Sequence, residues 1–301
     1  MTADVRAASR PPRRVLVTGA SGGIGSVTTA HLVAAGIAVT ALDRHGTLPP
    51  EADRQVRADA TDQTAIGAAL EDVDAVVHLA AIPHPTLGTP LEVFRTNVTA
   101  TFAVLSEAGA RGVRRAVIAS SVNASGVPFN PHGVMPAYYP IDEDLPVDLG
   151  DPYSLSKSVD ETTARMAHRT WGIDVVALRF PLVKDHDTLV RAAERTAEDP
   201  AATVREGWSY LDVRDAARAV HAALVAPLAG AHVVGLAASD TLLPGPTDEL
   251  LARWAPGVPV RSPLPGRSSA IDTRRAERLL GFRPEHTLQD AVAAPPTAEV
   301  A

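Results

Sequence analysis

Two residues four positions apart, Tyr153 and Lys157, carry the clearest chemical signal in this 301-residue chain. In a helix, side chains at positions i and i+4 lie on one face, so the phenol and the ammonium group would stand side by side. A cation beside a tyrosine favours the phenolate, and such a tyrosine can pass a proton to or from a reacting oxygen. The alternative is an ordinary surface pair, because this spacing often arises by chance.

Polar residues in two other segments are candidates to assist this pair. Ser120 and Ser121 end an apolar run that predicts a strand over 115–121, where a hydroxyl could hydrogen-bond a substrate oxygen. The alternative is that both serines satisfy backbone groups at the strand end. Asn97 lies inside a predicted helix over 90–110, where asparagine is a poor helix former. We interpret it as a functional residue, with a local kink as the alternative.

A second chemical signal is a glycine-rich turn near the start of the chain. Gly19, Gly22 and Gly25 follow an apolar strand and open an alanine-rich helix. Backbone N–H groups and the dipole at a helix N-terminus favour a phosphate, and glycine lets the backbone come close to it. The turn is therefore predicted to bind the pyrophosphate of a dinucleotide, with a plain strand-to-helix turn as the alternative.

Acidic residues at the ends of the next two predicted strands are placed to bind the nucleoside. Asp43 follows the glycine turn by roughly 20 residues, where a carboxylate accepts hydrogen bonds from ribose hydroxyls and favours NAD. Arg44 and Arg14 leave NADP open, because an arginine can accommodate a 2′-phosphate. Asp59, followed by Ala60, is a candidate contact for the adenine amino group. Capping of the next helix is the alternative for Asp59.

A fourth predicted strand, over 75–80, contributes a further part of the cofactor site. It runs into the sequence His78-Leu79-Ala80-Ala81, which we expect to form the wall beneath the nicotinamide ribose. We interpret the His78 side chain itself as buried and hydrogen-bonded.

The segments that hold all these residues alternate between strands and helices. Apolar runs predict strands over 14–18, 37–42, 55–59, 75–80, 115–121 and 173–180, with helices over 23–36, 62–71, 90–110 and 153–171 between them. Continuous apolar strands separated by helices are typical of a parallel sheet that is covered on both faces. We therefore predict an α/β fold with a doubly wound, Rossmann-like parallel sheet, and candidate residues gathered at its carboxyl edge.

The chain is predicted to fall into four parts, because the pattern loosens after Pro181. Shorter elements are expected over 187–197, 208–213, 214–225, 231–237, 247–254 and 272–280. We predict a disordered arm over 1–12, an NAD-binding domain over 13–181, a small substrate-binding lobe over 182–290 interleaved with late sheet elements, and a flexible tail over 291–301.

Composition excludes several functional classes. A net charge of −7 argues against nucleic acid and anionic membranes as partners, and the lack of cysteine excludes disulfides and thiol chemistry. No apolar run approaches the roughly 18 residues of a membrane helix. No signal-peptide core follows the arginine-containing N-terminus, so we expect a cytoplasmic protein. His84 and His132 have no spacing that defines a metal site, and no metal is expected.

These motifs, from the glycine turn to the Tyr153–Lys157 pair, follow one another along the chain in an order that resembles the extended branch of the short-chain dehydrogenase/reductase superfamily. This branch is also called the NAD-dependent epimerase/dehydratase family. The resemblance covers about 14–290 and is specific in the first 180 residues. It implies a catalytic triad of Ser121, Tyr153 and Lys157, with Asn97 supporting the lysine. It also implies a homodimer through the helices over 90–110 and 153–171. The residues expected to bind the cofactor are Gly19, Gly22, Gly23, Ile24, Gly25, Asp43, Arg44, Asp59, Ala60, Leu79, Ala80, Ala81, Tyr153 and Lys157.

Departures from the family pattern narrow the substrate. Val122 and Asn123 stand where dehydratases carry an Asp-Glu pair, so elimination of water is not expected. Leu182 and Trp208 stand where nucleotide-sugar enzymes carry an asparagine and an arginine that hold the diphosphate. A smaller substrate is therefore expected, and a weaker similarity to uronate dehydrogenases agrees with this. The candidate substrate contacts, each of which could instead be structural, are Pro83, His84, Ser121, Asn123, Arg179 and Trp208.

The sequence thus predicts an NAD-dependent oxidoreductase that transfers a hydride to or from a free sugar, a sugar acid or a similar hydroxylated or ketonic metabolite. Tyr153 would act as general acid/base, Ser121 would polarise the substrate oxygen, and Lys157 would stabilise the phenolate and hold the nicotinamide ribose. Two alternatives remain open. One is a sugar epimerase that retains its NAD, and the other is a non-catalytic nicotinamide-binding regulator of the same fold.

Overall fold

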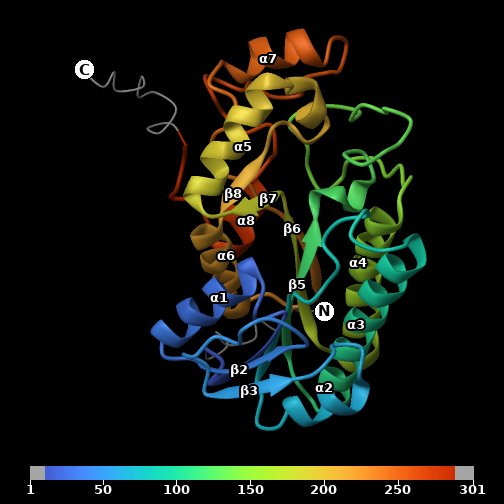
Figure 1. Cartoon of the computed structure of the whole chain (residues 1–301), viewed down its shortest axis with the longest axis vertical. Coiled ribbons are helices and arrows are strands. Elements are labelled where there is room, and N and C mark those ends of the chain that lie inside the picture. The colour runs from blue at the N-terminus through green and yellow to red at the C-terminus, as the bar shows by residue number, and fades with distance from the viewer. Residues whose placement is uncertain (1–10, 289–301) are drawn as a thin grey trace, which may run out of the picture.

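A seven-stranded parallel sheet runs through the computed structural model, which describes residues 11–288 (Figure 1). The strands lie in the order β3-β2-β1-β4-β5-β6-β9, and every neighbouring pair is parallel. Their bounds are β1 Arg14–Thr18, β2 Ala38–Asp43, β3 Arg54–Arg57, β4 Ala75–His78, β5 Arg115–Ser121, β6 Asp174–Phe180 and β9 Ala231–Gly235. The order reverses between β1 and β4, as in a doubly wound sheet, so the predicted fold class is confirmed.

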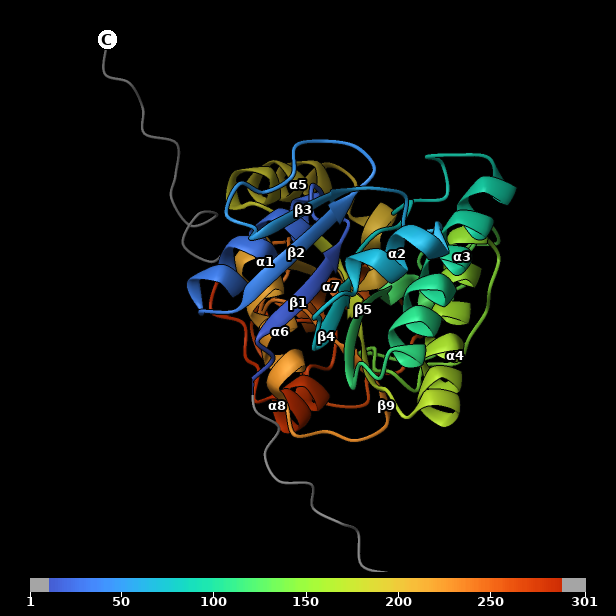
Figure 2. The ribbon, with the colours of Figure 1, turned by 90° about the horizontal axis from the view of Figure 1, so that it is seen from below.

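Helices cover both faces of this sheet (Figure 2). One face carries α1 (Gly23–Ala34), α6 (Val213–Val225) and α8 (Arg274–Leu280), and the other carries α2 (Gln63–Ala69), α3 (Pro90–Ala110) and α4 (Pro152–Trp171). Successive strand residues point to opposite faces, so Val15 and Val17 join the first core while Leu16 joins the second. The continuous apolar strands of the sequence are explained by this burial on two sides.

A C-terminal lobe lies beyond the carboxyl ends of β5 and β6, at the top of Figure 1. It has its own core around the fully buried side chains of Tyr139, Trp208 and Tyr210. Its elements are β7 (Leu182–Lys184), α5 (His186–Glu198), a 3-10 helix over Pro200–Glu206, β8 (Tyr210–Asp212) and α7 (Thr247–Trp254). Strands β7 and β8 form a separate parallel pair. Sequence patterns miss β7, because three residues are too few to show a period.

The outer edge of β9 is covered by side chains rather than by another strand. The backbone N–H of Gly235 donates to Glu143 Oε1 at 2.7 Å, and Arg275 Nη1 donates to the carbonyl of Val233 at 3.5 Å. Arg275 Nε and Glu143 Oε2 are 3.2 Å apart, so the two covering side chains also hold each other. Two of the backbone groups at this edge, the Gly235 N–H and the Val233 carbonyl, therefore have side-chain partners.

The predicted strands and helices are present with bounds shifted by a few residues. The predicted arm over 1–12 falls outside the described residues except for its last two positions, and the predicted tail over 291–301 falls wholly outside them. The domain boundary at residue 181 stays a prediction. Over residues 11–288, the helices are too short or too polar to cross a membrane.

Candidate active site

The glycine turn joins β1 to α1 and packs directly on the end of β4. Gly19 has φ +70°, and a Cβ there would lie 2.6 Å from the backbone nitrogen of Ala80. A Cβ on Gly25 would overlap the carbonyl oxygen of Gly19, whereas one on Gly23 would meet no described atom within 4 Å. No side chain of the described residues caps α1, so the first N–H groups of this helix are available to an anion.

Asp43, at the end of β2, is fixed beside the turn. Its Oδ2 accepts the N–H of Ser21 at 3.0 Å, and its Oδ1 accepts the N–H of His45 at 3.3 Å. A cavity of about 150 Å³ opens next to it. The cavity is lined by Gly19, Gly22, Leu42, Asp43, Arg44, Ala58, Asp59, Ala60, Leu79, Ala80, Ala81, Thr96 and Ala100. An uncapped helix end and a carboxylate beside a cavity fit the adenosine diphosphate half of NAD.

Arg44 and Asp59, both in the lining of this cavity, form an ion pair with Nη1 and Oδ2 3.1 Å apart. Asp59 also accepts hydrogen bonds from the N–H and the hydroxyl of Thr61. Partial burial raises the pKa of Asp59, but the Thr61 and Arg44 contacts outweigh it and hold the pKa below its usual value. The carboxylate is therefore charged and pairs with Arg44, and Asp62 rather than Asp59 caps α2.

Helix α4 brings Tyr153 and Lys157 together at the carboxyl edge. It begins there because Asp151 Oδ1 accepts the N–H groups of Tyr153 and Ser154, and because Pro152 fits a first helical turn. Lys157 Nζ lies 5.9 Å from the centre of the Tyr153 ring. Both side chains are buried, and Nζ donates to the carbonyl of Ala119 at 2.8 Å. The pair that the spacing predicts is thus formed, although its chemical role stays a prediction.

Ser121 ends β5, and a 3-10 helix (Val122–Ser125) follows it directly. Its Oγ accepts two hydrogen bonds from Asn123, one from the backbone N–H and one from Nδ2, each at 3.2 Å. Among the described residues, the hydroxyl hydrogen of Ser121 has one acceptor, the carbonyl oxygen of Phe180, and this lies 3.5 Å from Oγ. Asn123 Oδ1 is buried and accepts no hydrogen bond from residues 11–288. The Ser121 hydroxyl is therefore only weakly engaged as a donor, whereas Asn123 Oδ1 is enclosed without a partner.

Aromatic rings from two loops line up beside Tyr153. The centre of the Phe129 ring lies 6.1 Å from that of Tyr153, and the His84 ring lies 4.8 Å from Phe129 in an edge-on arrangement. Pro83 precedes His84 in the same loop. Neither sequence spacing nor residue type marked Phe129, because it lies in a proline-rich loop with no recognisable pattern.

Asn97 does not contact the lysine that it was expected to support. Its Oδ1 accepts the N–H of Ile82 at 2.8 Å, and its Nδ2 donates to the Ile82 carbonyl and to Ser156 Oγ. It therefore ties the loop after β4 to α4, and α3 continues through it without a break. The lysine is held by the Ala119 carbonyl instead.

Two of the expected substrate contacts are engaged within the protein. Arg179 makes a two-pronged ion pair with Glu161, with N–O distances of 2.8 and 3.0 Å, and Ser120 donates to the same carboxylate. Trp208 is fully buried in the lobe, and its Nε1 donates to the carbonyl of Pro200 at 2.8 Å. Each of these side chains thus has a partner within the protein, and their roles as substrate contacts stay predictions.

A buried polar group that the sequence analysis missed lies behind Lys157. Asp160, 1% exposed, has its Oδ2 3.2 Å from Lys157 Nζ. His78, also buried, contacts the hydroxyls of Thr18 and Thr101. Burial, and secondarily the Lys157 charge, lower the pKa of His78 to about 3, so the imidazole is neutral. The only sequence signal for Asp160 is a charged residue on the helix face that carries Lys157.

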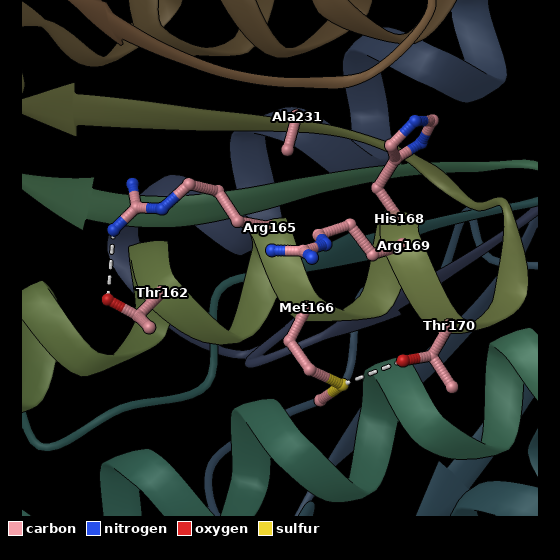
Figure 3. A pocket seen from close by; sticks show the side chains of 7 residues that line it. All are labelled: Thr162, Arg165, Met166, His168, Arg169, Thr170 and Ala231. Atoms are coloured by element: carbon pink, nitrogen blue, oxygen red, sulfur yellow. Dashed lines mark hydrogen bonds between the residues drawn. The ribbon is translucent and has the colours of Figure 1, made fainter.

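A separate groove of about 610 Å³ lies at the other end of α4 (Figure 3). Arg165, His168 and Arg169 project from the outer face of the helix, and Ala231 marks the start of β9. Arg165 lies 12 positions after Tyr153, which corresponds to roughly 18 Å along a helix. The groove is therefore remote from the tyrosine.

Comparison with known proteins places these features in a family. The model of the NAD dependent epimerase/dehydratase family matches residues 15–235. The UDP-glucose 4-epimerase of Bacillus subtilis is 30% identical over 169 residues, which cover 51% of this chain and 48% of that protein. The dTDP-glucose 4,6-dehydratase of Streptomyces niveus is 28% identical over 315 residues, covering 93% and 90%. In the Bacillus match the chain thus spans about half of the relative's length.

Solved structures agree with this placement. MoeE5 in complex with UDP-glucuronic acid and NAD is 27% identical, with a TM-score of 0.68 over 93% of this chain and 96% of that one. A mutated uronate dehydrogenase, 24% identical with a TM-score of 0.66 over 93% and 84%, shares the fold. The chain therefore belongs to the NAD-dependent epimerase/dehydratase family of enzymes, whose cofactor, NAD, fits the glycine turn and the cavity beside Asp43.

Proposed function

We propose that the protein is an NAD-dependent oxidoreductase that transfers a hydride to or from a small hydroxylated or ketonic substrate, such as a free sugar or a sugar acid. The observation that carries the proposal is the contact between Tyr153 and Lys157 at the carboxyl edge. Helix α4 packs there against β5 and the 3-10 helix that hold Ser121 and Asn123.

The chemistry follows from the hydrogen-bonding state of each group. Bound NAD supplies the acceptor or donor of the hydride. In the oxidative direction Tyr153 removes the hydroxyl proton of the substrate while the hydride leaves its carbon, and in the reductive direction it returns the proton. The Lys157 ammonium stabilises the phenolate that forms. Asn123 occupies both lone pairs of Ser121 Oγ, so the Ser121 hydrogen is directed to the substrate oxygen.

The preference for a small substrate rests on the positions that would have to hold a diphosphate. Leu182 has no donor, Trp208 is buried in the lobe, and Arg179 is neutralised by Glu161. Arg205, on the lobe side, donates to the carbonyls of Val127 and Asn130. A diphosphate carries charge that needs such donors, whereas a sugar hydroxyl needs only an uncharged partner such as the Ser121 hydroxyl.

The second candidate is an epimerase that retains its NAD and acts on a nucleotide sugar. The similarity to UDP-glucose 4-epimerases favours it. The same tyrosine would then remove a proton from one carbinol and return it after hydride has come back to the opposite face.

The test is to supply NAD⁺ and a panel of sugars, sugar acids and hydroxyketones, and to follow NADH by its absorbance. We expect NADH to accumulate, and Tyr153→Phe to reduce turnover by about 10²–10⁴-fold while NAD binding is retained. Tyr138→Phe, which removes a phenol hydroxyl in the lobe, is the matched control and should keep most of the activity. Interconversion of nucleotide sugars without net NADH would favour the second candidate. Full activity of Tyr153→Phe would contradict both.

We also propose that the protein is a homodimer that pairs through α3 and α4. Leu91 and Phe102 are exposed on α3 and stand 11 positions apart, about three helical turns, so they share a face. Leu155 is exposed on the neighbouring helix. Sedimentation should give a dimer that Phe102→Glu dissociates, whereas Val260→Glu, at an exposed apolar site in the lobe, should leave it intact. A monomeric wild-type protein would refute the pairing.

A further inference from the structure

The ion pair between Arg44 and Asp59 belongs to the lining of the cavity beside Asp43, where a carboxylate at the end of the second strand meets the ribose of a dinucleotide. We propose that Asp59 is a specificity-determining residue, which holds Arg44 in this pair and thereby withholds it from the 2′-phosphate of NADP. The inference concerns the cofactor alone, so it does not depend on the substrate or the reaction proposed above.

The Asp59 carboxylate is fixed in place by Thr61. Its Oδ1 accepts the backbone N–H of Thr61 at 2.9 Å and the Thr61 hydroxyl at 2.8 Å. Its other oxygen, Oδ2, lies 3.1 Å from Arg44 Nη1. Partial burial raises the pKa of Asp59, but the hydrogen bonds from Thr61 and Arg44 outweigh this and keep the pKa below its usual value. Asp59 is therefore a fixed negative charge at neutral pH, and Arg44 is its counter-ion.

Two other arginines on neighbouring strands are placed less well for a phosphate on the ribose. Arg14 begins β1, whereas the glycine turn follows the other end of that strand, about 13 Å away. Arg57 ends β3, and its Nη1 donates to the backbone carbonyls of His45 at 2.7 Å and of Asp43 at 3.4 Å. Among the described residues that line the cavity, Arg44 is the one with a positive charge.

The charge of a 2′-phosphate makes the engagement of Arg44 matter. A phosphate monoester carries a charge of about −1.5 to −2 at pH 7, where NAD has a neutral hydroxyl. If Arg44 turns to this phosphate, it leaves the Asp59 carboxylate unpaired beside a second anion. Giving up an exposed ion pair changes an equilibrium constant by up to about fivefold, and the repulsion between carboxylate and phosphate adds to that factor.

NAD makes no such demand on the pair. Its ribose hydroxyls need an acceptor, and Asp43 supplies one while its two oxygens keep the N–H groups of Ser21 and His45. Arg44 can then stay on Asp59 when NAD is bound. Removal of the Asp59 charge should therefore alter the affinity for NADP and leave that for NAD almost unchanged. A purely structural role of Asp59 would change both affinities together.

The test is isothermal titration of the full-length protein with NAD⁺ and with NADP⁺. Asp59→Asn keeps the shape of the side chain and removes its charge, and Asp62 rather than Asp59 caps α2, so this helix keeps its cap. We expect the Kd for NADP⁺ to fall by about tenfold and the Kd for NAD⁺ to change by less than about twofold. Asp59→Ala, which removes the carboxylate altogether, should shift the ratio of the two Kd values in the same direction.

The matched control is Asp72→Asn. It removes the same charge from another exposed arginine–aspartate pair, that of Arg54 and Asp72, which lies before β4 at the amino edge of the sheet. This variant should bind both dinucleotides as the wild type does.

A double variant shows whether Arg44 is the group that Asp59 withholds. In Arg44→Gln/Asp59→Asn the gain in NADP⁺ affinity should be lost. The proposal would be overturned if Asp59→Asn bound NADP⁺ no more tightly than the wild type, or if the double variant kept the gain. An equal loss of affinity for both dinucleotides in Asp59→Asn would also overturn it, because Asp59 would then be a contact of the part that NAD and NADP share.

Discussion

The glycine turn and the tyrosine–lysine pair lie on the same edge of one sheet, yet they are built by different means. At the turn, contacts are between backbone groups and close neighbours, and the essential property is the absence of side chains at Gly19 and Gly25. At the tyrosine, buried charges and hydroxyls from separate elements hold one another, as in the contacts of Lys157 with the Ala119 carbonyl and with Asp160. The first region is defined by steric fit and the second by electrostatic pairing.

Steric fit at the turn predicts the largest effect. In Gly25→Ala the new methyl group would overlap the Gly19 carbonyl, and we expect the free energy of unfolding to fall by about 4 kcal/mol. Gly23→Ala, two positions earlier, places its methyl group in open space and should change stability by no more than about 0.5 kcal/mol. Urea unfolding without NAD measures both, and equal stability of the two variants would contradict the steric account.

Electrostatic pairing predicts a smaller but still large effect at Arg179. Arg179→Met leaves the buried Glu161 carboxylate without its cation, and we expect a loss of about 3 kcal/mol in urea unfolding. The double variant Arg179→Met/Glu161→Gln removes the unpaired charge and should recover part of that loss. Arg54→Met breaks an exposed pair with Asp72 and should cost no more than about 0.5 kcal/mol. A double variant less stable than Arg179→Met would rule out the unpaired charge as the cause.

The smallest effect is expected at the buried His78, as a change in how the free energy of unfolding depends on pH. Its pKa in the folded protein is about 3, below the value of 6.5 for a free side chain. Protonation therefore favours the unfolded chain, so this contribution is full above about pH 6.5 and is lost as the pH falls toward about 3. Between about pH 7.5 and pH 5.5, the wild type should lose about 1.4 kcal/mol more stability than His78→Gln.

Unfolding by urea at the two pH values measures this difference. His45→Gln, which alters an exposed imidazole just after β2, is the control and should follow the wild type. If His78→Gln and the wild type had the same pH dependence, the neutral state of His78 would not be the source of the effect.

The comparison also explains what the sequence could predict. The glycine spacing and the i, i+4 relation of Tyr153 and Lys157 are local patterns, and both have the expected geometry. The partners of Asn97 and Arg179 are not local. Asn97 bonds Ser156, 59 positions away, and Arg179 bonds Glu161 on a different element. A single sequence records which residues are polar but not which of them meet, so the pairing of Asn97 with Ser156 and of Arg179 with Glu161 could not be predicted from it.

The lobe was harder to predict for a related reason. Its strands β7 and β8 have three residues each, and Trp208, with φ +52°, adopts a backbone conformation that no residue-type rule assigns to tryptophan. Its helices α5 and α7 follow a helical period, but the rest of its core is assembled from loops and short strands in which no period appears.

The side chains that lie along the outer edge of β9 limit how one copy of this chain can associate with another. An open edge strand is a template on which another chain can add its own strand, and repeated addition leads to fibres. Glu143 and Arg275 bond two outward groups of β9, and β3, at the other edge, begins and ends with an arginine. The proposed contact through α3 and α4 differs in this respect, because a two-fold contact between helix faces closes at two copies and stops.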